Sequence, residues 1–60
     1  MSYVIVKEVH GFRYYYGKFG RWEGLINHAV TYQRLETVIP TVNNLKIQMK
    51  EKENIYYLNN

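Results

Sequence analysis

The chain has 60 residues, which is enough for one domain with one core, so we treat residues 1–60 as a single domain. It contains no cysteine and only two histidines, which excludes disulfides and thiolate metal sites. Its net charge is +3, with eight Lys and Arg against five Glu, and this sign excludes an acidic mimic of DNA.

Aromatic residues make up 17% of the chain, as seven Tyr, two Phe and one Trp. One small core cannot hold all ten rings, and exposed apolar side chains usually mark contact sites. Small domains without disulfides or metal are often stabilised by self-association. We therefore predict surface aromatic residues that contact a partner, and a homo-oligomer, most simply a homodimer.

The first part of the chain predicts a β-hairpin. Residues 3–9 are rich in β-branched side chains, and residues 12–16 are mostly aromatic, which is typical of strands. His10-Gly11 lies between the two segments and fits a two-residue turn. Apolar residues fall on both faces of each strand, which favours a thin sheet with a helix on one face and a second subunit on the other.

A helix is indicated further along by an apolar stripe. Leu35, Val38, Ile39, Val42 and Leu45 fall at helical spacing. Pro40 disfavours a regular helix, which leaves two interpretations. Either the helix spans about 33–45 with a kink, or a helix from about residue 23 stops near residue 38. The first interpretation is preferred, because its stripe is the longer one.

The start of this helix and the end of the chain complete the predicted order. Gln33 is the expected N-cap, with Glu36 three residues later as in a capping box. Ile47 and Met49 alternate with polar residues, which indicates a strand, and residues 51–54 are a polar turn. Residues 55–58 are a candidate fourth strand. The prediction is an α+β fold, strand–strand–helix–strand, with one helix on a small antiparallel sheet.

The spacing of apolar residues resembles small uncharacterised proteins encoded by bacteriophages and prophages. The residues that carry the resemblance are Trp22, Ile26, Ala29, Tyr32, Glu36, Val38 and Leu45. The chain departs from that pattern at Gln33 and at Pro40. The resemblance implies a phage accessory protein or inhibitor that binds a host or phage protein, and it carries over no functional residue.

The residues that catalysis or metal binding would need are scattered. His10 fits the hairpin turn and His28 a polar position before the helix, with no recognised ligand spacing. The segment 17–21 has two glycines and two cations but lacks the Gly-Lys-Ser/Thr of a phosphate-binding loop, so we predict a plain hairpin loop. We predict that the protein is not an enzyme and uses no cofactor or metal.

One cluster interleaves cations with aromatic rings and is the predicted partner-binding site: Arg13, Tyr14, Tyr16, Lys18, Phe19, Arg21 and Trp22. Protein-binding hot spots are enriched in Trp, Tyr and Arg. Single-stranded nucleic acid is bound by the same residue types, through stacking and backbone charge. The cations are spread along the whole chain, so we favour a protein partner over nucleic acid.

The location is predicted from what the sequence lacks. No apolar stretch approaches the roughly 20 residues of a membrane span, and the N-terminal residues do not resemble a signal peptide. We therefore expect a cytoplasmic protein that does not contact the membrane.

Overall fold

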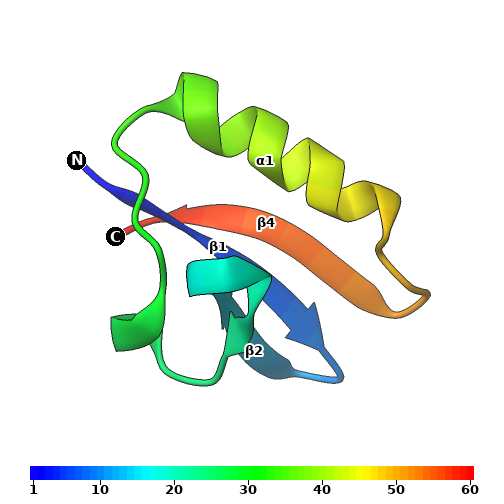
Figure 1. The fold of residues 1–60 in the computed structure, drawn as a ribbon. Helices are drawn as coiled ribbons and strands as arrows, with labels where there is room; N and C mark the ends of the chain where they lie inside the picture. Colours follow the sequence, from blue (N-terminus) through cyan, green and yellow to red (C-terminus); the bar gives the residue numbers. More distant parts are fainter.

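The computed structural model describes all residues, 1–60. It contains a four-stranded antiparallel sheet in the order β3-β2-β1-β4, with one long helix packed against it (Figure 1). The α+β prediction is confirmed. The elements are β1 (Tyr3–Val9), β2 (Phe12–Tyr16), β3 (Trp22–Glu23), α1 (Leu35–Ile47) and β4 (Glu53–Asn59).

The β1–β2 hairpin forms where the sequence predicted it. His10 and Gly11 have φ values of 51° and 82°, so both turn residues are left-handed. A two-residue turn of this kind matches the twist of the strands that it joins, and Gly11 adopts it without strain. His10 is therefore a turn residue, at the tip of the hairpin.

The helix runs through Pro40, as in the preferred interpretation, from Leu35 to Ile47. Proline cannot donate to the carbonyl four residues earlier, which belongs to Glu36. Both residues are exposed, so water can hydrate that carbonyl. The helix therefore tolerates Pro40 because the proline lies on its solvent side.

Two local predictions were wrong, and the candidate strand at residues 55–58 is present but longer than predicted. The N-cap is Arg34 rather than Gln33, and it makes no side-chain cap hydrogen bond. Residues 47–50 do not form a strand, because Ile47 ends the helix and the Met49 N–H closes its last turn on the Lys46 carbonyl at 3.0 Å. The final strand spans residues 53–59 rather than 55–58, since β4 pairs with β1 over seven residues. No local pattern predicted β3, which has only two residues.

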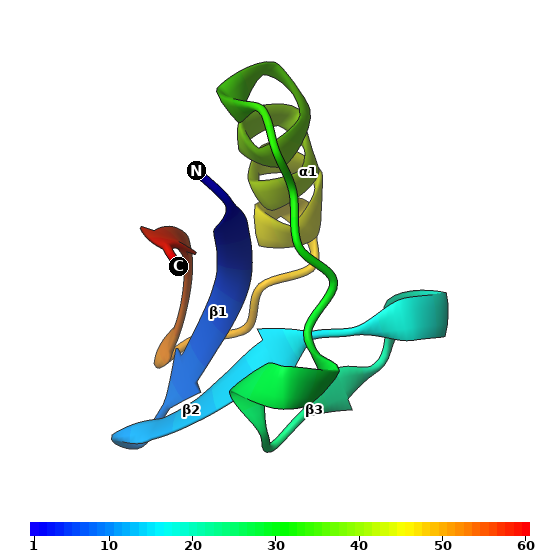
Figure 2. The same ribbon diagram turned by 90° about the vertical axis from the view of Figure 1, so that its left-hand side faces the viewer.

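The core lies between α1 and the two strands nearest the ends of the chain, β1 and β4. Ile5 and Ile55 from the sheet meet Val38 and Val42 from the helix. Partly buried side chains surround this cluster: Tyr3, Tyr16, Trp22, Tyr32 and Leu45. Figure 2 shows α1 on one side of β1, with the segment after residue 29 running toward the start of the helix.

The opposite face of β1 is also buried within one chain. Val4 and Val6 alternate with Ile5 along the strand and so face away from α1, yet both are fully buried. The register places Leu58 beside Val4, and Tyr15 and Tyr56 on either side of Val6. Burial of this face therefore does not need a second subunit, which explains why the strand shows no clean alternation.

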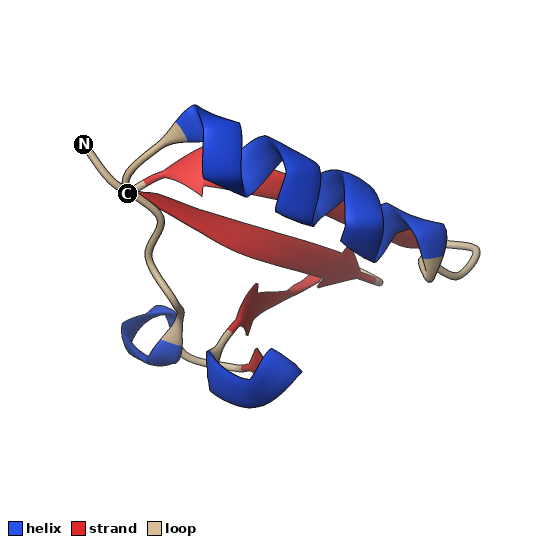
Figure 3. Cartoon of the chain, turned by 45° about the horizontal axis from the view of Figure 1, so that its top comes forward, coloured by secondary structure: helices blue, strands red, loops and turns tan.

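The segment that leads into the helix forms backbone hydrogen bonds with β1 and with the end of β2. Where β2 ends, Tyr32 takes its place beside β1 and exchanges two backbone hydrogen bonds with Tyr3, at 2.7 and 2.8 Å. The Val30 N–H donates to the Tyr16 carbonyl at 2.9 Å. Two short 3-10 turns, Lys18–Gly20 and Ile26–His28, lie together at the β2–β3 end, away from α1 (Figure 3).

Candidate binding surface

The loop of residues 17–21 is the most exposed part of the predicted site. Phe19 is 94% exposed, and its backbone is left-handed, with φ 60° and ψ 26°. The Gly17 N–H donates to the Arg21 carbonyl at 2.7 Å, and the Arg21 N–H donates to the Lys18 carbonyl at 3.3 Å. The loop is therefore closed at its base and presents an aromatic ring between two exposed cations.

Gly17 fixes the base of this loop. It is buried, and a Cβ there would lie 2.7 Å from the Glu23 Cγ and 3.0 Å from the His28 carbonyl oxygen. Real Cβ atoms essentially never come within 3.0 Å of another atom, so a larger residue at this position would force the Glu23 side chain and the His28 carbonyl to shift. Gly17 therefore allows the base of the loop to lie close to β3 and to the 3-10 turn of residues 26–28.

Tyr16 and Trp22 of the predicted site are half-buried. Their rings lie 5.1 Å apart at an interplanar angle of 59°, and both pack against the core. The Lys7 Nζ lies 4.7 Å from the centre of the Trp22 ring, within range of a cation–π interaction. Much of the surface of these two rings is therefore used inside the chain.

Arg13 and Tyr14 point to opposite faces of the sheet, since they are neighbours in β2. The Arg13 Nε lies 3.6 Å from Glu8 Oε1 on the face away from α1. Tyr14 is directly opposite Lys7, on the helix-bearing face, and is 37% exposed. The predicted site is therefore not one surface. Arg13 lies on one face of the sheet, and the three rings of Tyr14, Tyr16 and Trp22 lie on the helix-bearing face. Only Lys18, Phe19 and Arg21 share one exposed loop.

Sequence reasoning missed Phe12. It is 68% exposed and lies two residues before Tyr14 in β2, so both side chains are on the helix-bearing face of the sheet. The helix packs on β1 and β4 and leaves this part of the face open. The exposure of Phe12 beside Tyr14 could have been inferred from the sequence, because residues two apart in a strand lie on the same face.

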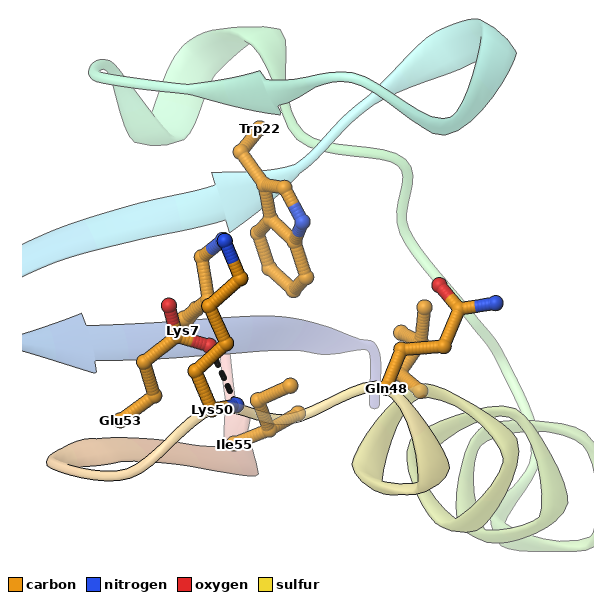
Figure 4. Close-up of a pocket in the computed structure, with 7 residues that line it drawn as sticks. Lys7, Trp22, Gln48, Lys50, Glu53 and Ile55 are labelled. Atoms are coloured by element: carbon orange, nitrogen blue, oxygen red, sulfur yellow. Dashed lines mark hydrogen bonds between the residues drawn. The ribbon is translucent and has the colours of Figure 1, made fainter.

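A small cavity opens beside the end of the helix (Figure 4). Its volume is about 160 Å³. The Lys50 N–H donates to Glu53 Oε1 at 3.1 Å, and Lys7, Trp22 and Gln48 also line the cavity (Figure 4). Pockets for small molecules usually exceed about 300 Å³, so this cavity is sized for water or a small ion.

A second cavity, of about 340 Å³, lies beside the base of the loop and is lined by Lys18, Glu23, Asn27, His28 and Ala29. It reaches the roughly 300 Å³ that pockets for small molecules usually have. His28 Nδ1 is 3.9 Å from Glu23 Oε1, which is beyond the hydrogen-bond distance that a general acid–base pair requires. No group of three or more His, Asp or Glu residues is placed to hold a metal ion.

Two tyrosines have a raised pKa. Burial, together with the nearby Tyr16, raises the pKa of Tyr32, and burial followed by a hydrogen bond to Glu8 raises that of Tyr56. Neither tyrosine lines a cavity or belongs to the loop. Both shifts therefore report packing in the sheet rather than a reactive group in an open site.

Comparison of the chain with protein-family models, with curated protein sequences and with solved structures finds no match. The only helices are too short or too polar to cross a membrane.

Proposed function

We propose that this domain is a non-enzymatic binding module that docks on another protein through the loop of residues 17–21. The observation that carries the proposal is the exposure of Phe19, at 94%, on a closed loop with a left-handed backbone. Given the resemblance of the chain to phage accessory proteins, we take the partner to be a host or phage protein.

The backbone at Phe19 supports a functional role. A left-handed conformation costs a non-glycine residue about 1–2 kcal/mol, and glycine or asparagine would adopt it at lower cost. An aromatic ring in solvent contributes nothing to the core that would offset this cost. Strained backbone positions of this kind cluster at binding and catalytic sites.

The loop also has the chemistry of a protein-binding hot spot. An aromatic side chain can fill an apolar pocket in the partner, and the flanking Lys18 and Arg21 can pair with acidic groups at the rim of that pocket. Because the Gly17–Arg21 hydrogen bond already closes the loop, little ordering entropy is lost on binding. The partner should therefore present an apolar pocket bordered by carboxylates.

The test compares two equivalent substitutions, Phe19→Ser in the loop and Phe12→Ser on the sheet. Tagged wild-type and variant proteins are used to capture partners from nuclease-treated lysate of the source cells. We expect a protein that wild type and Phe12→Ser retain and Phe19→Ser loses. Retention of the same proteins by all three would contradict the proposal.

Binding of single-stranded nucleic acid is a second candidate, favoured by a separate observation. Phe12 and Tyr14 are both exposed on one face of β2, and Lys7 is directly opposite Tyr14. Two adjacent rings beside a cation can stack bases and contact phosphate. For this function, Phe12→Ser should weaken binding to a single-stranded oligonucleotide and Phe19→Ser should not, and affinity should fall steeply with salt.

A further inference from the structure

β4 forms the free edge of the sheet. It pairs with β1 on one side, and no strand lies on its other side. The Asn60 N–H donates to the Ser2 carbonyl at 2.8 Å, which fixes the phase of the ladder. The even-numbered residues of β4 therefore bond to β1, and the odd-numbered ones point their backbone groups outward.

The outward backbone groups have no partner within the chain. The N–H and C=O groups of Ile55, Tyr57 and Asn59 take part in none of the turn and loop hydrogen bonds. The Glu53 N–H is different, because it donates to the Lys50 carbonyl at 3.1 Å. A row of three consecutive outward positions is thus ready to pair with another strand.

The edge lacks the features that normally prevent such pairing. Proteins protect free edges with lysine, with proline or with very short strands. β4 is seven residues long and contains no Lys, Arg or Pro. The other edge of the sheet, β3, has only two residues.

We propose that a second copy of this chain pairs with β4 in the antiparallel direction across a two-fold axis, so that the two sheets become one continuous sheet. If all seven residues of β4 pair with β4 of the second copy, the two-fold axis passes through the position of the central residue, Tyr56. Tyr57 then lies opposite Ile55 of the second copy, and Glu53 lies opposite Asn59, so no like charges meet. The strand is therefore complementary to itself.

The surface of the single chain also favours this pairing. Tyr57 is 38% exposed at the edge, with only an edge-on contact to Tyr3 at 5.8 Å. In the dimer its open side would be covered by the second copy. This inference does not depend on the function proposed for the loop.

The first test measures the mass of the protein in solution by sedimentation over a range of concentrations. We expect a wild-type dimer whose melting temperature rises with concentration. Tyr57→Lys adds a charge at the edge and should give a folded monomer, checked by circular dichroism. Asn43→Lys adds the same charge on the exposed side of the helix and should remain a dimer.

A monomeric wild type at the highest soluble concentration would overturn the proposal, and so would a Tyr57→Lys protein that stays dimeric. Because the wild-type mass needs no substitution, the proposal remains testable even where a variant does not fold.

The second test locates the axis by cross-linking. The chain has no cysteine, so each introduced one is unique. In the proposed pairing the two copies of residue 56 form a non-hydrogen-bonded pair with their Cα atoms about 4.5 Å apart, which a disulfide can bridge. Under mild oxidation Tyr56→Cys should form a covalent dimer faster than Asn43→Cys. Equal rates for the two variants would contradict the proposed edge.

Discussion

The Tyr56 hydroxyl donates a hydrogen bond to Glu8 Oε1 at 2.9 Å, on the sheet face away from the helix. The same carboxylate oxygen lies 3.6 Å from the Arg13 Nε, so side chains from β4, β1 and β2 form one chain of polar contacts. Burial first, and then the bond to Glu8, raise the pKa of Tyr56 above its ordinary value of 10.0. Because of this contact, we expect the free energy of unfolding to depend on pH in the alkaline range.

We expect the free energy of unfolding to fall as the pH rises above 10. Between the ordinary and the raised pKa, Tyr56 is ionised in the unfolded chain but still protonated in the fold, so the unfolded state binds fewer protons. Tyr56→Phe should cost about 1 kcal/mol at neutral pH and make the alkaline decline shallower. Tyr32, whose pKa is also raised, keeps part of the decline. Urea unfolding at several pH values measures both effects, and parallel pH profiles would refute the role of Tyr56.

Trp22 and Phe19 should respond differently to truncation. Trp22 packs against Tyr16 and the core, so Trp22→Ala should lower the free energy of unfolding by about 2 kcal/mol. Phe19 is in solvent, and Phe19→Ala should change it by less than about 0.5 kcal/mol. Urea unfolding followed by circular dichroism compares the two variants. Equal losses of stability would show that the loop and the core are not separated as described.

Gly17 and Gly24 form a matched pair for testing the base of the loop. A methyl group at Gly17 would contact the Glu23 side chain and the His28 carbonyl, so Gly17→Ala should cost about 1–3 kcal/mol. Gly24 has nothing within 4 Å of its Cβ position, and Gly24→Ala should stay within about 0.5 kcal/mol of wild type. Thermal unfolding measures the difference. Two neutral variants would mean that the loop base is not tightly packed.

Pro40 offers a stabilising substitution. It is exposed and lies inside the helix, where proline costs up to about 3 kcal/mol relative to alanine. Replacing it also makes the unfolded chain more flexible, which offsets part of the gain. We expect Pro40→Ala to raise the free energy of unfolding by about 1–2 kcal/mol. A loss of stability in urea unfolding would show that Pro40 has a packing role that the structure does not reveal.

The sequence predicted those elements whose local pattern agrees with their tertiary setting. His10-Gly11 specifies its own turn, and Val38, Val42 and Leu45 of the predicted stripe pack on the core, whereas Leu35 and Ile39 stay exposed. The strand at residues 47–50 was predicted from the alternation of Ile47 with polar neighbours. Because Ile47 is 81% exposed at the end of the helix, this alternation does not mark a buried face of a strand. Glu53 joined β4 through pairing with Val9, which is a long-range contact.

The candidate site was predicted only as a segment. Ten aromatic residues compete for one small core, and local sequence does not say which rings go inside. Which rings are buried depends on the pairing of Tyr16 in β2 with Trp22 in the very short β3, because this pairing turns both rings toward the core. Phe19 lies in the loop between them and stays outside the core.

The most direct test of the central claim uses Phe19→Asn, since asparagine accepts the left-handed backbone better than phenylalanine does. The affinity of the purified captured protein for this variant is measured by titration calorimetry, beside its stability in urea. We expect a free energy of unfolding higher by about 0.5–1 kcal/mol and binding weaker by at least about 30-fold. A variant that is equally or more stable and still binds with wild-type affinity would contradict the claim that Phe19 is the anchor of this module.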